Sequence, residues 1–154
     1  MKIKIIGIGQ TDDRRMLDLC TIYEKRLKHY CPLELLFLSP KKKRTEPNEV
    51  IKIEGEALLS KIKPSSEVIL LDEVGTQYSS IGFSKFLQQR MNASSRELIF
   101  LIGGAYGFSN EVIQRANHRL ALSKMTFTHQ MVRLIFLEQL YRAFTLIRGE
   151  KYHH

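Results

Sequence analysis

The segment Leu98-Ile99-Phe100-Leu101-Ile102-Gly103-Gly104-Ala105-Tyr106-Gly107 decides the fold that we expect for this chain. Its five leading apolar residues are typical of a buried strand, and the glycines after them are typical of a loop. A second apolar run, Leu120-Ala121-Leu122, leads in the same way into a polar loop, and a long helical pattern follows. Loops at the carboxyl ends of neighbouring parallel strands form the ligand sites of α/β sheets. We call residues 103–107 the glycine loop and residues 123–128 the hydroxyl loop, and we expect them to form one pocket.

Strand-like and helix-like segments alternate five times along the chain. The expected strands are residues 3–8, 33–38, 68–71, 98–102 and 120–122, and the expected helices are residues 13–30, 47–61, 80–91, 109–116 and 129–148. This alternation predicts an α/β fold in which a mainly parallel five-stranded sheet carries helices on both faces. At this length, residues 1–154 are expected to form a single domain.

The sequence also argues against several classes of protein. No apolar run reaches the roughly 18 residues that a membrane span needs, and the first residues are typical of a strand rather than a signal peptide. We therefore expect a cytoplasmic protein without membrane contact. Cys20 and Cys31 do not have zinc-ligand spacing, so no metal is expected. The second half holds no Asp and no Gly-x-Ser-x-Gly elbow, which argues against a catalytic triad.

The charge of the chain is strongly basic and uneven. The net charge is +8, and residues 78–154 hold 10 Lys+Arg against 4 Asp+Glu. This half also contains both predicted loops, and a basic surface beside a pocket suits a polyanion such as RNA. The basic run at residues 41–44 is a further candidate for phosphate contacts, although a lone cluster of this kind is more often a solvated loop.

Two glycine patterns allow more than one interpretation. Gly7-Ile8-Gly9 hints at a dinucleotide-binding turn, but Asp12 stands where the third glycine belongs, which disfavours an NAD-dependent oxidoreductase. The glycine loop lacks the lysine of a phosphate-binding loop. Its glycines let the main chain approach a flat ligand such as adenine, or they serve only a tight turn between a strand and a helix.

The last expected helix, residues 129–148, has almost no polar face. A helix that is apolar all round must be buried all round. We expect one side to pack on the sheet and the other side on a second copy of the chain, which predicts a homodimer. His129 and Arg133 share a face of this helix, whereas Arg142 points away from Arg133 and can form an ion pair with Glu138.

Five short motifs together carry a resemblance to a known family. They are Leu71-Asp72-x-x-Gly75, Ile102-Gly103-Gly104-x-x-Gly107, Leu122-Ser123-Lys124-Met125-Thr126-Phe127-x-His129, Glu138-Gln139-Leu140-Tyr141-Arg142-Ala143 and Tyr152-His153. With them, the chain resembles the RlmH family of SPOUT-class methyltransferases, which act on bacterial large-subunit ribosomal RNA. The resemblance covers the chain from Met1 to His154. One residue departs from the family pattern, because Thr128 stands where these proteins usually have proline.

The resemblance implies a fold, a cofactor and a product. The fold is a SPOUT-type α/β domain with a C-terminal trefoil knot, and the cofactor is S-adenosylmethionine. The product is N3-methylpseudouridine in large-subunit (23S) ribosomal RNA, formed on the assembled ribosome. The implied cofactor-binding residues are Leu71, Gly103, Gly104, Leu122, Ser123, Lys124, Met125, Thr126 and Phe127.

The chemistry of methyl transfer also assigns candidate catalytic and RNA-binding residues. An activated methyl group needs positioning and a mild base rather than a metal, and His129 and His153 are the candidate bases. Arg142 joins them as a catalytic candidate, and the expected RNA contacts are Lys124, Arg133, Arg142 and Tyr152. Because Arg133 and Arg142 face apart, we expect a composite site in which a partner subunit offers Arg142 and the tail. A non-catalytic ribosome-binding factor is the alternative function.

Overall fold

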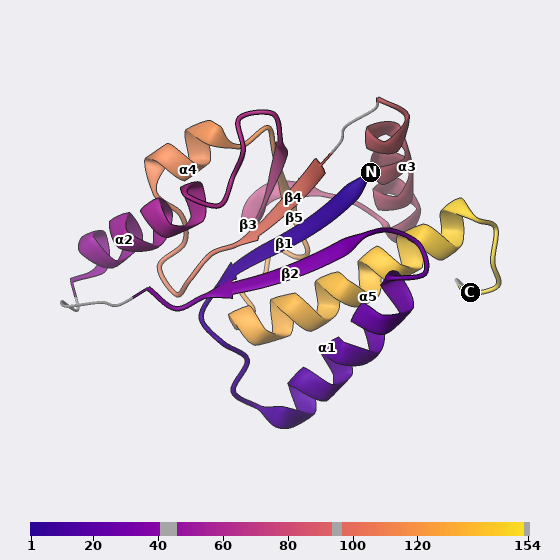
Figure 1. Cartoon of the computed structure of the whole chain (residues 1–154), viewed down its shortest axis with the longest axis horizontal. Helices are drawn as coiled ribbons and strands as arrows, with labels where there is room; N and C mark the ends of the chain where they lie inside the picture. Colours follow the sequence, from indigo (N-terminus) through magenta and orange to yellow (C-terminus); the bar gives the residue numbers. More distant parts are fainter. Residues whose placement is uncertain (41–45, 94–96, 153–154) are drawn as a thin grey trace.

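Five parallel strands form one sheet in the computed structural model, which describes residues 1–40, 46–93 and 97–152 (Figure 1). The strands are β1 (Lys2–Ile8), β2 (Leu33–Leu38), β3 (Glu67–Gln77), β4 (Glu97–Ile102) and β5 (His118–Ala121). Their order across the sheet is β2-β1-β4-β3-β5, and every neighbouring pair is parallel. The predicted α/β fold with a parallel five-stranded sheet is therefore confirmed.

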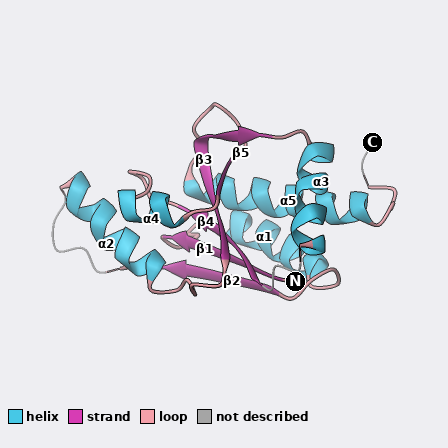
Figure 2. Ribbon diagram, turned by 90° about the horizontal axis from the view of Figure 1, so that it is seen from above, coloured by secondary structure: helices cyan, strands magenta, loops and turns pink. Residues whose placement is uncertain are grey.

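Helices cover both faces of this sheet, as predicted (Figure 2). They are α1 (Arg14–Leu27), α2 (Pro47–Leu59), α3 (Ser80–Asn92), α4 (Asn110–Arg115) and α5 (His129–Ile147). α1, α3 and α5 pack on one face, whereas α2 and α4 pack on the other. Within the described residues, no helix combines the length and the apolar character that crossing a bilayer requires.

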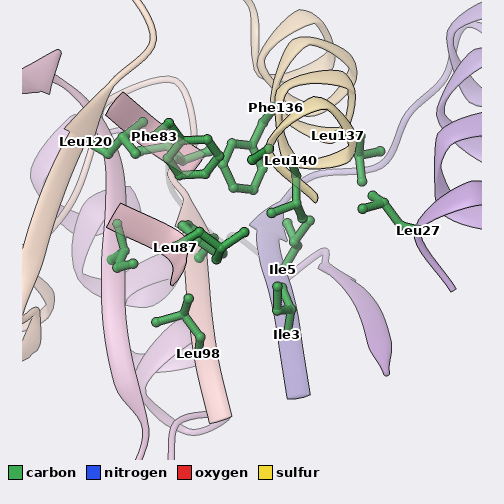
Figure 3. Close-up of a cluster of buried hydrophobic side chains, with 14 of the residues drawn as sticks. Ile3, Ile5, Leu27, Phe83, Leu87, Leu98, Leu120, Phe136, Leu137 and Leu140 are labelled. Carbon is green, nitrogen blue, oxygen red and sulfur yellow. The ribbon is translucent and has the colours of Figure 1, made fainter. Parts of the chain in front are cut away.

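The larger hydrophobic core lies between the sheet and the helices α1, α3 and α5 (Figure 3). Three aromatic rings meet at its centre, from α3, β4 and α5. The ring centroids of Phe100 and Phe136 are 4.6 Å apart, and Phe83 lies 6.0 Å from Phe136 and 6.4 Å from Phe100. Such tilted and edge-on pairs add to the stabilisation from burial. The core therefore fixes α5 firmly against the sheet.

The apolar circumference of α5 is largely covered within one protomer. This helix lies between α1 and α3 and rests on β4, and its inward residues Phe136, Leu140 and Phe144 are buried. Figure 3 shows Leu137 of α5 facing Leu27 of α1. The neighbouring helices α1 and α3 therefore cover part of the surface that we expected a second copy to cover, and the homodimer stays a prediction. The composition of α5 alone no longer argues for a dimer.

β3 is longer than the sequence pattern predicted. Its pairing with β5 shifts register between Leu71 and Thr76, which both lie opposite Leu120, and the strand then continues to Gln77. A Cβ on Gly75 would lie 2.6 Å from the backbone nitrogen of Leu120. The irregular segment therefore needs glycine at this close approach between two backbones. The register shift carries Asp72 and Glu73 away from the regular ladder, at the end of the sheet where the predicted loops lie.

Candidate functional site

A pocket opens where β3, β4 and β5 end. These strands are neighbours in the sheet, so the loops that follow them meet at one edge. The pocket has a volume of about 730 Å³, which lies in the range of small-molecule sites. Its lining residues are Leu71, Asp72, Glu73, Ile102, Gly103, Gly104, Ala105, Tyr106, Gly107, Leu122, Ser123, Met125, Thr126, Phe127, Thr128, His129, Gln130 and Val132.

The glycine loop forms one wall of the pocket as a tight turn. The amide of Gly107 donates to the carbonyl of Gly104 at 3.2 Å, and Gly107 has a φ of 81°, which favours glycine. A Cβ on Gly103 would lie 3.2 Å from the carbonyl oxygen of Gly107. The interpretation as a tight turn is therefore confirmed, and because the same residues leave the main chain bare beside the pocket, their approach to a flat ligand stays a prediction.

Glu54 lies directly behind the glycine loop, and sequence reasoning gave it no role. Its side chain is only 2% exposed, and a Cβ on Gly104 would lie 2.9 Å from its carboxyl carbon. The signal was present in the sequence, because Glu54 occupies the apolar face of α2 between Val50 and Leu58. A carboxylate at such a position is buried against a neighbour, and here the neighbour is the glycine loop.

The hydroxyl loop forms the opposite wall. The hydroxyl of Ser123 accepts from the amide of Met125 at 2.9 Å, and the hydroxyl of Thr126 donates to Glu73 Oε2 at 2.7 Å. The second bond joins the loop after β5 to the end of β3. Lys124 is exposed and does not line the pocket. Of the nine residues predicted to hold a cofactor, it is the single one that the pocket wall does not include.

The structure shows why threonine can replace the usual proline at position 128. It is the N-cap of α5, with a φ of −61° that proline also adopts, so the main chain can follow the same path. Its hydroxyl accepts from the amide of Met131 at 3.4 Å. Thr128 therefore keeps a backbone angle that proline would fix and adds a side-chain cap to the helix.

His129, the first residue of α5, lies between the pocket and the end of β1. His129 lines the pocket, and a Cβ on Gly9 would lie 3.5 Å from its Nε2. The imidazole and Arg133 fill the space beside the turn that follows Gly7-Ile8-Gly9. This packing disfavours a dinucleotide at that turn, because protein side chains stand where the ligand's phosphates would lie.

Arg133 does not face the pocket or the surface, which corrects the prediction that it contacts RNA. The side chain is 1% exposed, and its guanidinium donates to Thr11 Oγ1 at 2.7 Å and to the carbonyls of Ile8 and Gly9 at 2.8 and 2.7 Å. It also lies 4.0 Å above the ring of Phe37. Burial lowers the pKa of this guanidinium. Arg133 therefore ties α5 to the loop after β1 instead of binding a phosphate.

Arg142 and Tyr152 form a cluster at the far end of α5. Arg142 Nη2 lies 2.6 Å from Glu138 Oε1, and its guanidinium carbon is 4.8 Å from the centroid of the Tyr152 ring. Burial and a hydrogen bond with Tyr23 raise the pKa of Tyr152 to about 12. Arg142 follows His129 by thirteen positions along α5, which corresponds to a rise of roughly 20 Å. One protomer therefore does not bring these two predicted catalytic residues together.

Two of the predicted features lie outside the described residues. They are His153, a candidate base, and the basic run at residues 41–44. Within the described part of the chain, no group of three or more His, Cys, Asp or Glu side chains is arranged to hold a metal ion. Cys20 and Cys31 are buried free thiols, and burial raises the pKa of Cys31 to about 11.

Known proteins resemble this chain over its whole length. A family model described as "Predicted SPOUT methyltransferase" matches residues 1–153. A protein of Christiangramia forsetii named ribosomal RNA large subunit methyltransferase H is 50% identical over 156 residues, covering 100% of this chain and 99% of that protein. Proteins of the same name are 50% identical in Cytophaga hutchinsonii and 45% identical in Trichlorobacter lovleyi, with 100% of both chains covered in each case.

Proposed function

The chain belongs to the SPOUT methyltransferase family, and on that basis we propose that it methylates large-subunit ribosomal RNA with S-adenosylmethionine as the methyl donor. The observation that carries the proposal is the pocket of about 730 Å³ between the glycine loop and the hydroxyl loop. The names of the relatives support ribosomal RNA as the substrate. The net charge of +8 agrees with a polyanionic substrate, and a ribosomal substrate implies a cytoplasmic location.

The pocket fits the proposed donor in size and in chemistry. Its volume suits a nucleoside with an amino-acid tail, and the glycine loop offers bare main chain to an adenine ring. The residues that would hold the donor are Leu71, Gly103, Gly104, Leu122, Ser123, Met125, Thr126 and Phe127. When bound, the donor supplies a methyl carbon that is already activated for attack by a ring nitrogen.

The chain's own residues position the reactants and manage one proton. The pocket walls hold the donor in one orientation, and positioning of this kind can supply several kcal/mol of the barrier, up to roughly 7–11 kcal/mol. The ring nitrogen of a pseudouridine must lose its proton before or during attack. His129 is the candidate base, because this residue lines the pocket and imidazole is a side chain suited to general base catalysis at neutral pH.

We further propose that two copies of the chain build the complete site. His129 and Arg142 are roughly 20 Å apart along one helix, so a second copy must bring Arg142, Tyr152 and His153 to the pocket if they act there. Arg142 and Tyr152 already stand in one cluster around Glu138. In the partner, this cluster would contact the RNA, and Lys124 in the hydroxyl loop is a further expected RNA contact. The C-terminal trefoil knot that the resemblance implies stays a prediction, as does N3 of pseudouridine as the methylated atom.

The composite site is tested with mixed dimers. A Val132→Phe subunit, in which the new ring enters the pocket, is paired with an Arg142→Ala subunit. If the site is shared, the mixed dimer holds one intact site and is active, although each homodimer of the variants is inactive. Loss of activity in every combination would show that each subunit uses its own Arg142 or that the residue has another role.

The function itself is tested by mass spectrometry of ribosomal RNA. Large subunits and assembled ribosomes that lack the modification are incubated with the protein and methyl-labelled S-adenosylmethionine. We expect the label on one pseudouridine of the 23S RNA, at N3, in the assembled ribosome. Unlabelled RNA together with no calorimetric heat from S-adenosylmethionine would support the alternative of a non-catalytic ribosome-binding factor.

A further inference from the structure

The wall of the pocket holds a carboxylate in place without neutralising its charge. Glu73 is exposed and lines the pocket at the end of β3. The hydroxyl of Thr126, from the opposite wall, donates to Glu73 Oε2 at 2.7 Å. A hydroxyl is an uncharged donor, so it fixes the position of the carboxylate and leaves its charge intact. Among the residues that the structure describes, no Lys, Arg or His forms an ion pair with Glu73.

The neighbouring carboxylate, Asp72, differs in this respect. Its Oδ1 accepts from the amide of Val74 at 3.3 Å, and its Oδ2 lies 3.8 Å from Arg119 Nη1. Asp72 therefore shapes the turn after Leu71, and a cation partly balances its charge. Glu73 is the carboxylate whose charge acts most directly on a ligand.

The charge of the pocket wall is opposite to that of the whole chain. The chain has a net charge of +8, yet the described lining residues include two carboxylates and neither Lys nor Arg. A pocket of this kind favours a cationic ligand, because nearby unit charges of opposite sign attract even in a well-solvated site.

The two ligands of the proposed reaction differ in charge by one unit. S-adenosylmethionine carries a sulfonium, an ammonium and a carboxylate, so its net charge near neutral pH is positive. Transfer of the methyl group leaves S-adenosylhomocysteine, in which the sulfur is an uncharged thioether. A fixed carboxylate beside the ligand therefore attracts the donor more strongly than the product.

We propose that Glu73, held by Thr126 at the pocket wall, makes the pocket select the positively charged methyl donor over its uncharged thioether product. The inference rests on the proposed function and assigns a specificity-determining role to Glu73. Its consequence is that the spent product leaves the pocket more readily than fresh donor, which reduces product inhibition.

Calorimetry on the full chain with three ligands tests this proposal. The ligands are S-adenosylmethionine, S-adenosylhomocysteine and sinefungin, an analogue that carries an ammonium group in place of the sulfonium. Glu73→Gln keeps the shape of the side chain and its ability to accept from Thr126, but it removes the charge. We expect this variant to bind the two cationic ligands about three- to tenfold more weakly and the thioether with unchanged affinity. Thr126→Val should produce a smaller weakening of the same kind.

Glu56→Gln is the matched control, because Glu56 is an exposed glutamate on α2 that does not line the pocket. If Glu56→Gln weakens donor binding as much as Glu73→Gln does, the effect comes from the net charge of the whole chain and the proposal is wrong. Equal weakening of all three ligands by Glu73→Gln would also overturn it, while the proposed function would stand. If the unmodified chain binds neither S-adenosylmethionine nor sinefungin, the proposed function itself fails.

Discussion

Replacement of Arg133 by methionine separates a structural role from the RNA-binding role that the sequence predicted. In the structure, the guanidinium supplies three hydrogen bonds of 2.7–2.8 Å to Thr11 Oγ1 and to the carbonyls of Ile8 and Gly9. Methionine keeps much of the apolar volume and donates none of these bonds. The carbonyl of Ile8 is then left without its buried partner.

The expected loss of stability follows from these bonds. A buried polar group without its partner costs about 1–3 kcal/mol, whereas removal of a buried cation recovers part of a desolvation penalty. We expect Arg133→Met to lower the free energy of unfolding by about 2–4 kcal/mol. For a chain of this size, that corresponds to a melting temperature lower by roughly 5–15 °C. The free energy of unfolding of Arg133→Lys should lie between those of the unmodified chain and Arg133→Met, because one ammonium cannot replace all the hydrogen bonds of a guanidinium.

Urea and thermal unfolding measure this effect, and binding to ribosomal RNA is measured on the same variants. Arg14→Met is the control, because Arg14 is an exposed arginine near the same loop and its loss changes the net charge equally. If Arg133→Met unfolds like the control but loses RNA affinity, the structural role is wrong and the prediction from the sequence is right.

Three further predictions follow from the pocket, the bulge in β3 and a buried thiol. Val132→Phe should weaken binding of S-adenosylmethionine by at least about tenfold because its ring enters the pocket, whereas Met131→Phe, on an exposed position outside the lining, should bind normally in the same calorimetric titration. Gly75→Ala should lower the midpoint of urea unfolding strongly, because its Cβ would lie 2.6 Å from the backbone nitrogen of Leu120; an unchanged midpoint would mean that the two strands can separate there. Burial raises the pKa of Cys31 from 9.0 to about 11, so the folded state keeps the proton longer than the unfolded state. Its contribution to stability should be complete below pH 9 and decline between pH 9 and 11, and urea titrations should show a smaller decline in Cys31→Ala.

Gly103 is a poor position for a variant that tests the pocket. Gly103→Val would place a side chain where adenine is expected, but its Cβ would already lie 3.2 Å from the carbonyl of Gly107. The substitution would disturb the turn itself as well as the ligand space. Val132 is a better position for a blocking side chain, because it stands on a helix that the core holds in place.

The sequence predicted the strands and helices well because their signals are local. The apolar run at residues 98–102 can be buried on both sides only as a central strand, and the glycines after it stop the strand. The same reasoning predicted which loops line the pocket, since the carboxyl ends of parallel strands lie along one edge. It failed for the extent of β3, because the pairing of Thr76 and Gln77 with β5 depends on a register shift between distant segments.

The roles of the charged side chains were predicted less well. Arginine is usually exposed, so a pattern cannot distinguish one that contacts RNA from one that is buried and bonded to backbone carbonyls, as Arg133 is. Glu54 and Glu73 had no apparent role because each acts across a contact between segments distant in sequence. Glu54 lies against Gly104 of the glycine loop, and Glu73 receives a hydrogen bond from Thr126, which lies 53 residues away.

By itself, the sequence determined the α/β fold, the parallel sheet, the family and the two loops of the pocket. The fold, the sheet and the loops follow from the periodicity of apolar residues and from glycine at turns, which are properties of short segments. The family follows from the similarity of the whole sequence to known proteins. Only the tertiary structure decided which charges face the pocket and which are buried elsewhere. The physical reason is that the energy of a charged side chain depends on the partners and the solvent around it, and folding alone brings those partners together.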